Sequence, residues 1–415
     1  MTAARGLPNV AEAMSFLIPS RTLRPADDPI FALNAEAKAR EKAGEHVVNA
    51  TVGSLLDDDG KLATLEGVNE ALRDLPPQVV AGYAPIAGSP DFLRGVALDL
   101  FGDRPEAKMV ASVATPGGTG ALRHAIANFL EPGQALLTSS FYWGPYKTLA
   151  DESDRGLETF PMFTGSGGLD TDGFHAELDR LVKKQGRALV LLNSPCHNPS
   201  GYSFDDAEWK RLRAAIEDIS AKGPVTVCLD IAYAKFGAQP LDVMLDAMLP
   251  IANKALVLFA WSASKAFLEY GLRVGALVAV QPEEEERRRI QNALVYSCRG
   301  TWSNVNAGGM AAIANILLDS TRRARVDRER AGLIELLGRR VAKFNELAAK
   351  AGLTYPRYDG GFFTTVFVKD ARDAAERLKA DGIFVVPQPG ALRVALCSVA
   401  ERDIPRLVEG LAKVA

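Results

Sequence analysis

Short apolar runs alternate with amphipathic stretches through the middle of the chain. Runs of this length predict strands that are buried on both faces. They occupy residues 110–114, 134–138, 187–193, 225–231, 255–261 and 273–280. Helical periodicity fills the intervals, as at 121–130 and 205–219. Strands that alternate with helices are typical of an α/β fold with a mostly parallel sheet and helices on both of its faces.

The two ends of the chain show a different pattern. After about residue 307, long helical periodicity extends over 309–318 and 321–351. A small α+β pattern follows, with strands expected at 362–368, 383–386 and 392–396 and a helix at 373–379. Near the N-terminus we expect a helix at 28–42 with Pro29 in its first turn, a strand at 47–52 and an acidic loop at 53–60.

These patterns predict two domains and an arm. A chain of 415 residues is long enough for two hydrophobic cores. The N-terminal strand is expected to join the C-terminal α+β unit, which makes the smaller domain discontinuous. The predicted parts are an arm at 1–26, a small domain from 27–60 and 325–415, and a large domain at 61–324.

Composition narrows the class of protein. A hydrophobic content of 47% and a charged content of 24% match an ordinary globular protein. The net charge of -3 gives no reason to expect nucleic acid or a membrane surface as a partner. No apolar run is long enough to span a bilayer, and the N-terminus lacks a signal-peptide pattern. The four cysteines form no CxxC pair, so we expect no metal site and no disulfide framework, and a cytoplasmic setting.

The most informative residue is Lys265, in the run Ser262-Ala263-Ser264-Lys265 that follows the strand expected at 255–261. Open α/β sheets bind their ligands at the carboxyl ends of strands. Arg273 follows shortly afterwards, and Asp230 ends another apolar run. Taken singly, Lys265 could be an ordinary solvated surface lysine, and Asp230 could be an ordinary turn or helix-cap residue. Together, the lysine, hydroxyls, arginine and aspartate suit pyridoxal phosphate.

Four motifs occur in a fixed order along the chain. They are residues 115–123 (TPGGTGALR), 196–201 (CHNPSG), 230–233 (DIAY) and 262–265 (SASK). In this order and with Arg273 they resemble the signatures of the aspartate and aromatic aminotransferases, which are fold-type I pyridoxal-phosphate enzymes. The resemblance covers nearly the whole chain from about Asp28. It implies a seven-stranded major domain, pyridoxal 5'-phosphate as cofactor and a homodimer with shared active sites.

The resemblance also assigns roles around the cofactor ring. Lys265 would form the Schiff base with the cofactor and then move the substrate's Cα proton. Asp230 would pair with the protonated ring nitrogen. Tyr233 and Asn198 would donate hydrogen bonds to the phenolic oxygen, although Asn198 before a proline is also ordinary turn chemistry. Trp143 would stack on the ring and touch the substrate, with core packing as the rival interpretation.

The cofactor's phosphate is expected where the glycine-rich turn begins a helix. Exposed N–H groups and the helix dipole favour an anion there. By resemblance, the phosphate-binding residues are Gly118, Thr119, Ser262, Ser264 and Arg273. The family's tyrosine that reaches the phosphate from the neighbouring subunit corresponds to Tyr83.

Substrate selection is expected from two arginines and a loop. Arg393 matches the family's bidentate partner of the α-carboxylate. Arg299 matches the arginine that reaches across the dimer to a second carboxylate, and a surface salt bridge is the other interpretation. Gly53 belongs to a loop that closes over the substrate in the family, where Asn198 and Trp143 also contact the substrate. The implied substrates are aspartate, glutamate and their 2-oxo acids, with aromatic amino acids left open.

The chain departs from the family pattern at several positions. Tyr146 and Asn193 stand where the family commonly has histidines, and Val305-Asn306 stands where prolines are common. These changes leave the cofactor residues intact and put the identity of the substrate in doubt. The prediction is an aminotransferase with ping-pong kinetics. A lyase or decarboxylase on the same fold, or a cofactor-binding sensor without turnover, remains an alternative.

Overall fold

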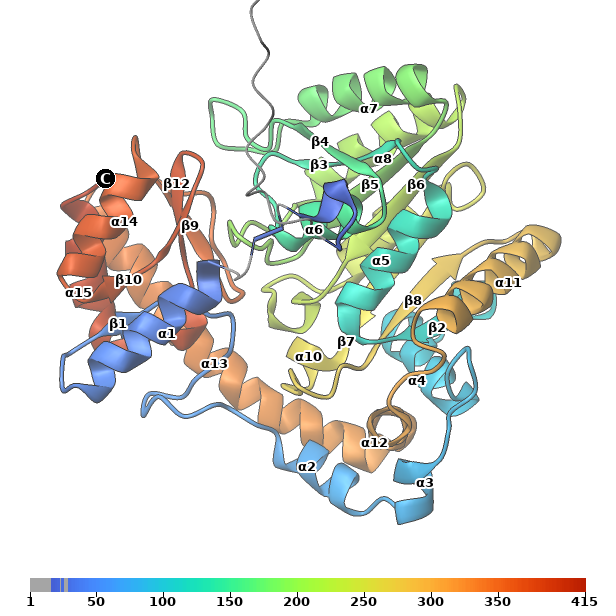
Figure 1. The fold of residues 1–415 in the computed structure, drawn as a ribbon, viewed down its shortest axis with the longest axis horizontal. Helices are drawn as coiled ribbons and strands as arrows, with labels where there is room; N and C mark the ends of the chain where they lie inside the picture. Colours follow the sequence, from blue (N-terminus) through green and yellow to red (C-terminus); the bar gives the residue numbers. More distant parts are fainter. Residues whose placement is uncertain (1–15, 23, 26–28) are drawn as a thin grey trace, which may run out of the picture.

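The computed structural model describes residues 16–22, 24–25 and 29–415. A seven-stranded sheet lies at the centre of this described part of the chain (Figure 1). Its strands in chain order are β2 (Val110–Thr115), β3 (Ala135–Ser139), β4 (Gly156–Phe160), β5 (Ala188–Asn193), β6 (Val225–Asp230), β7 (Leu256–Ser262) and β8 (Gly275–Val280). In space their order is β2-β8-β7-β6-β5-β3-β4. β8 runs antiparallel to β2 and β7, and the other pairs are parallel, which confirms the predicted mostly parallel sheet.

Helices cover both faces of this sheet. Along β7, Val257 and Phe259 belong to one apolar cluster and Leu258 and Ala260 to another, because side chains of a strand alternate between faces. The second cluster also contains side chains of α5 (Gly117–Phe129), α6 (Pro145–Glu152) and α11 (Glu284–Thr301). The first cluster contains side chains of α4 (Pro90–Phe101), α7 (Thr171–Gln185), α8 (Asp206–Ser220), α9 (Asp242–Met248) and α12 (Ala307–Leu318). Helices α2 (Glu66–Arg73) and α3 (Pro77–Ala81) pack against α12.

A smaller α+β unit combines both ends of the chain (Figure 1). It contains α1 (Pro29–Lys42), β1 (Val48–Asn49), β9 (Thr364–Phe367), α14 (Ala371–Ala380), β10 (Ile383–Phe384), β11 (Val386–Gln388), β12 (Ala391–Val394) and α15 (Ile404–Ala412). β1 pairs in parallel with β10, so the N-terminal strand lies beside the C-terminal unit. The long helix α13 (Ser320–Lys350) runs through residue 325, where we placed a domain boundary. The exact domain boundaries stay a prediction.

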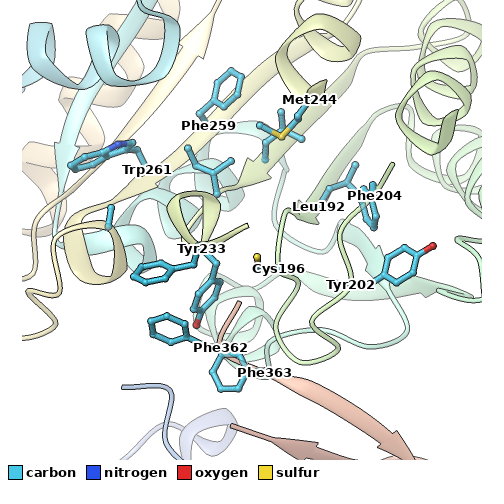
Figure 2. Close-up of a cluster of buried hydrophobic side chains, with 14 of the residues drawn as sticks. Leu192, Cys196, Tyr202, Phe204, Tyr233, Met244, Phe259, Trp261, Phe362 and Phe363 are labelled. Atoms are coloured by element: carbon cyan, nitrogen blue, oxygen red, sulfur yellow. The ribbon is translucent and has the colours of Figure 1, made fainter. Parts of the chain in front are cut away.

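The two units meet at an aromatic contact (Figure 2). The Tyr233 ring lies 5.3 Å from the Phe362 ring and 5.7 Å from the Phe363 ring, measured between centroids. Tyr233 follows β6 of the large sheet, whereas the two phenylalanines directly precede β9. Residues from both units therefore meet where the carboxyl ends of the central strands lie.

Several predicted element bounds were wrong. The strand expected at 47–52 is only Val48–Asn49; Ala50 still donates to the Phe384 carbonyl of β10, but the Thr51 N–H and hydroxyl donate to the Asn49 side chain instead of to a strand. The strand expected at 383–386 is divided into β10 and β11, which belong to different sheets. β4 was not predicted, since it is a half-buried edge strand without a continuous apolar run. The glycine-rich turn is already helical, because α5 begins at Gly117.

The N-terminal arm lies partly outside the described residues, as does Asp28 of the first predicted helix. The described part of the arm contains one 3-10 turn (Pro19–Arg21), and Arg21 in this turn forms an ion pair with Glu152 at 2.7 Å. No helix among the described residues is long and apolar enough to cross a bilayer.

Candidate active site

A cavity of about 460 Å³ opens at the carboxyl ends of β5, β6 and β7. This is the edge of an open α/β sheet where ligands bind, and the volume suits a small molecule. The large sheet provides one wall, and the small unit provides the other through the 52–54 loop, Phe363 and Arg393. The cavity contains these residues predicted from the sequence: Gly53, Gly118, Thr119, Trp143, Asn198, Asp230, Tyr233, Ser262, Ser264, Lys265, Arg273 and Arg393.

Lys265 reaches the cavity from the short helix α10 (Ala263–Ala266), which directly follows β7. The Ser262 hydroxyl accepts a hydrogen bond from the backbone N–H of Ser264 and so begins this helix. The lysine Nζ donates to the Gly53 carbonyl at 2.8 Å and lies 4.4 Å from the centre of the Tyr270 ring. Burial lowers the pKa of the Lys265 amine to about 8. A larger neutral fraction makes this amine a better nucleophile near neutral pH.

Asp230 ends β6 and is buried at 6% exposure. Its Oδ2 accepts a hydrogen bond from the Tyr146 hydroxyl at 2.6 Å, and its Oδ1 accepts one from the backbone N–H of Ala232 at 3.2 Å. No lysine, arginine or histidine within the described ranges forms an ion pair with it, and burial raises its pKa. A buried carboxylate without a cation is unfavourable. The site therefore suits a ligand that brings a protonated nitrogen.

An anion cradle lies at the start of α5. Gly117 has a φ of +70°, and a Cβ there would lie 2.6 Å from Arg273 Nη2, so only glycine allows this approach. Arg273 Nη1 donates to the Tyr270 carbonyl at 2.9 Å and lies 3.4 Å from the Ser264 hydroxyl. A helix N-terminus, serine hydroxyls and a guanidinium around one cavity suit a phosphate group.

Tyr233 and Asn198 lie next to each other in the cavity wall. Asn198 Nδ2 lies 3.4 Å from the Tyr233 hydroxyl, and both side chains are buried. The Asn198 Oδ1 atom has no hydrogen-bond partner among the described residues. Buried polar atoms are normally paired, so this side chain suits a polar ligand atom.

Arg393 and Trp143 line the same cavity. Arg393 lies on β12, only 4% exposed, with its guanidinium 4.7 Å from the centre of the Phe363 ring. It donates to the Thr51 carbonyl. The Trp143 ring lies at the other side and packs edge-on against Tyr146. A guanidinium fork held in this way suits a carboxylate.

Two predicted site residues do not line this cavity. Tyr83 is 96% exposed, between α3 and α4. Arg299 is exposed on the last turn of α11, where it donates to the Ser303 hydroxyl at 3.2 Å. Both side chains are exposed at the surface of the protein.

The cavity also contains residues that sequence reasoning missed. The most informative are Ile30 and Phe31, from the first turn of α1, together with Tyr270 and Phe363. Tyr270 lies between Lys265 and Arg273 in the sequence, and this position could have predicted that it lines the cavity. No sequence signal predicted Ile30, Phe31 and Phe363, because their positions depend on how the small unit packs against the large one.

The sheet, the lysine after β7, the aspartate after β6 and the anion cradle together define a fold-type I pyridoxal-phosphate enzyme. Residues 45–411 match the family model for aminotransferase class I and II. The chain belongs to this family. It is a pyridoxal-phosphate-dependent aminotransferase of the aspartate and aromatic class.

Individual relatives agree with this assignment. The chain is 27% identical to an aspartate aminotransferase of Pseudomonas aeruginosa, over 93% of this chain and 97% of the relative. It is 29% identical to a tyrosine aminotransferase of Klebsiella pneumoniae, over 89% and 94% of the two chains. A crystal structure of an aminotransferase from Anaerococcus prevotii superposes with a TM-score of 0.90 at 32% identity, covering 96% and 99%. An aromatic-amino-acid aminotransferase from Burkholderia pseudomallei, covalently bound to pyridoxal phosphate, gives 0.80 at 26% identity, covering 96% and 99%.

Proposed function

We propose that this aminotransferase moves the amino group of an L-amino acid of the aspartate and glutamate type to a 2-oxo acid such as 2-oxoglutarate. Both half-reactions use the same site in turn, in ping-pong order. The observation that carries the proposal is that Lys265, Asp230 and Arg393 line one cavity. An aromatic donor is the second candidate, which the Phe31 and Phe363 side chains in the cavity wall favour.

The proposed chemistry divides among the residues around the ring. Pyridoxal phosphate supplies an electron sink for the bond that breaks at the substrate's Cα. Lys265 would hold the cofactor through its side-chain amine, and the same amine, once the substrate has replaced it, would take the proton from Cα and return it at C4′. Asp230 holds the proton on the ring nitrogen. Tyr233 and Asn198 donate hydrogen bonds to the phenolic oxygen.

The remaining predicted residues bind and orient. Gly118, Thr119, Ser262, Ser264 and Arg273 hold the phosphate in the cradle at the start of α5. This fixes the cofactor at its far end, so that the ring cannot slide away from Asp230. The donor set already present there, with the backbone of a helix start, supports this role.

Substrate orientation depends on Arg393. Its guanidinium binds the α-carboxylate with two hydrogen bonds, which places the Cα–H bond toward Lys265. Trp143 covers the ring, and the loop that carries Gly53 closes over the substrate. The hydrogen bond from Lys265 to the Gly53 carbonyl supports the proximity of this loop to the reacting atoms.

The active form is proposed to be a homodimer. Tyr83 and Arg299 are exposed and do not reach their own cavity. In a dimer, Tyr83 would reach the partner's phosphate and Arg299 the distal carboxylate of the partner's substrate. Exposed apolar side chains near them in the sequence, Val80 and Tyr296, support an interface.

A cytoplasmic location is also part of the proposal. All four cysteines are buried and free of disulfides. Free thiols persist in a reducing compartment. A relative from chicken, 29% identical over 71% of this chain, is named as a cytoplasmic aspartate aminotransferase.

Replacing Arg299 by leucine tests the choice of substrate. Charge-assisted hydrogen bonds contribute about 1.5–3 kcal/mol each, so kcat/KM for aspartate is expected to fall roughly 10- to 100-fold. For phenylalanine, kcat/KM is expected to change by less than about threefold, because its side chain has no carboxylate for Arg299 to bind. Steady-state kinetics with both donors checks this. Arg288→Leu, on the same helix, is the control, and an equal loss for both donors would contradict the assignment.

The pH dependence of cofactor capture follows from the pKa of Lys265. Burial lowers this pKa to about 8, so the neutral, nucleophilic amine predominates above that pH. The rate constant for capture of pyridoxal phosphate by the cofactor-free protein is expected to rise through about pH 8 and then level off. Stopped-flow absorbance measures this rate. A rate that falls over the same pH range would be inconsistent with capture by the neutral amine.

The proposal as a whole is tested by adding single L-amino acids to the cofactor-loaded protein without any 2-oxo acid. Aspartate, glutamate, phenylalanine, tyrosine and alanine form the panel. Loss of the visible band with one equivalent of 2-oxo acid per site is expected, fastest for aspartate or glutamate. Release of CO₂ or an olefinic product instead would indicate a decarboxylase or lyase, and no conversion of any donor would indicate a sensor.

A further inference from the structure

We propose that Tyr146 is the positioning residue of this site: it fixes the Asp230 carboxylate, which would pair with the ring nitrogen, and Trp143, which would stack on the ring. The inference rests on the roles proposed above for Asp230 and Trp143. From the sequence alone, Tyr146 is a tyrosine at a position where the family commonly has a histidine, and no function follows from that.

The first contact is the hydrogen bond to Asp230. The Tyr146 hydroxyl donates to Asp230 Oδ2 at 2.6 Å. Tyr146 is 1% exposed, so water does not compete for the carboxylate from that side. Hydrogen bonds to charged acceptors are the stronger class, especially where the surroundings are apolar. The bond therefore holds the carboxylate in one rotamer.

Asp230 depends on this bond for its side-chain position. Among the described residues, the only other hydrogen bond to its carboxylate comes from the backbone N–H of Ala232, at 3.2 Å to Oδ1. Asn193 Nδ2 donates at 2.8 Å to the backbone carbonyl of Asp230 and so fixes the main chain rather than the carboxylate. Without Tyr146, one carboxylate oxygen would remain buried without a donor.

The second contact is with Trp143. The two ring centroids lie 5.7 Å apart with an interplanar angle of 89°, an edge-to-face pair. The Tyr146 backbone N–H also donates to the Trp143 carbonyl at 2.9 Å, where α6 begins. One rigid side chain thus touches both Asp230 and Trp143, the two residues proposed to contact the cofactor ring.

The hydroxyl keeps its proton. Burial raises the pKa of Tyr146 well above its ordinary value, and the neighbouring Asp230 carboxylate, Cys228 and Tyr233 raise it further. Tyr146 therefore stays protonated near neutral pH and is the donor in its hydrogen bond with Asp230. The carboxylate stays the acceptor, which favours its ionised form.

Replacing Tyr146 by phenylalanine tests the proposal, with Tyr142→Phe in the same segment as the matched control. The change removes one hydroxyl and keeps the ring. For Tyr146→Phe, the dissociation constant of pyridoxal phosphate, titrated into cofactor-free protein, is expected to rise roughly tenfold. In the loaded protein, kcat is expected to fall roughly tenfold while KM changes less than about twofold, because Arg393 still binds the substrate. Tyr142→Phe is expected to match the unmodified protein in all three constants.

A double-mutant cycle separates positioning from a general structural effect. In an Asp230→Ala background, which removes the acceptor of the Tyr146 hydrogen bond, Tyr146→Phe is expected to change the dissociation constant of pyridoxal phosphate by less than about twofold. A tenfold effect that persists in that background would overturn the proposal, as would unchanged constants for Tyr146→Phe alone. Tyr146→His, which restores a donor, is expected to recover part of the affinity. These binding measurements remain valid even if the unmodified protein fails to transaminate, which would refute the proposed function separately.

Discussion

Lys265→Ala is expected to reduce kcat by roughly 10⁴-fold or more, which is the largest effect of any single change in this protein. The substitution removes both the covalent attachment of the cofactor and the group that moves the Cα proton, and acid–base catalysis alone contributes about 10²–10⁴-fold. The phosphate cradle at the start of α5 does not involve this amine, so cofactor binding is expected to persist, with weaker affinity.

The measurement is product formation from aspartate and 2-oxoglutarate, together with cofactor content after gel filtration. Lys254→Ala is the control. Lys254 lies just before β7, whereas Lys265 lies just after it, and its half-exposed side chain forms only a long ion pair with Glu217, at 3.6 Å. Turnover by Lys265→Ala within tenfold of the unmodified protein would remove this lysine from the mechanism.

Asp230→Asn is expected to have the second-largest effect, a fall of kcat by roughly 10²–10³-fold. The expected size of this fall in kcat follows from the loss of one negative charge beside the group on which charge develops in the transition state. The amide has nearly the same shape and can still accept the Tyr146 hydrogen bond, so folding is expected to be preserved. KM is expected to change little, since the substrate carboxylate binds to Arg393.

Kinetics and thermal melting of the Asp230→Asn protein check this together. Asp242→Asn is the control, because Asp242 is an exposed carboxylate that pairs with Arg104 far from the cavity. Full activity of Asp230→Asn at an unchanged melting temperature would contradict the role of this carboxylate. Loss of folding would instead show that Asp230 is mainly structural.

The positions of site residues were predictable where a reactive or charged side chain comes at the end of a strand. Lys265 and Asp230 each follow an apolar run, and the end of a parallel strand fixes its position in space. Gly118 and Arg273 were predictable for a similar reason, because a glycine turn at a helix start and a nearby arginine form an anion site. The order of these motifs gave the family, which the matching family model confirms.

Other features depend on packing that no local pattern records. Phe31 and Phe363 reach the cavity only because the two ends of the chain fold into one unit, through the pairing of β1 with β10. The strand expected at 47–52 shows the opposite error. Its apolar residues suggested a long strand, yet Thr51 donates to the Asn49 side chain instead of to a strand, and Val52 and Gly53 line the cavity.

The function of Tyr146 also required the structure. From the sequence it is known only as a residue that stands where the family commonly has a histidine. Only the folded chain brings its hydroxyl to Asp230, 84 residues further on. Its identity as tyrosine therefore matters for the cofactor rather than only for the core.

The most direct test of the account is to locate the covalent attachment of the cofactor. The cofactor-loaded protein is reduced with borohydride, digested and mapped by mass spectrometry. The account predicts one modified peptide, with the phosphopyridoxyl group on Lys265, and none when excess aspartate is added before reduction. Attachment at another lysine, or no attachment in protein that still transfers amino groups, would contradict it.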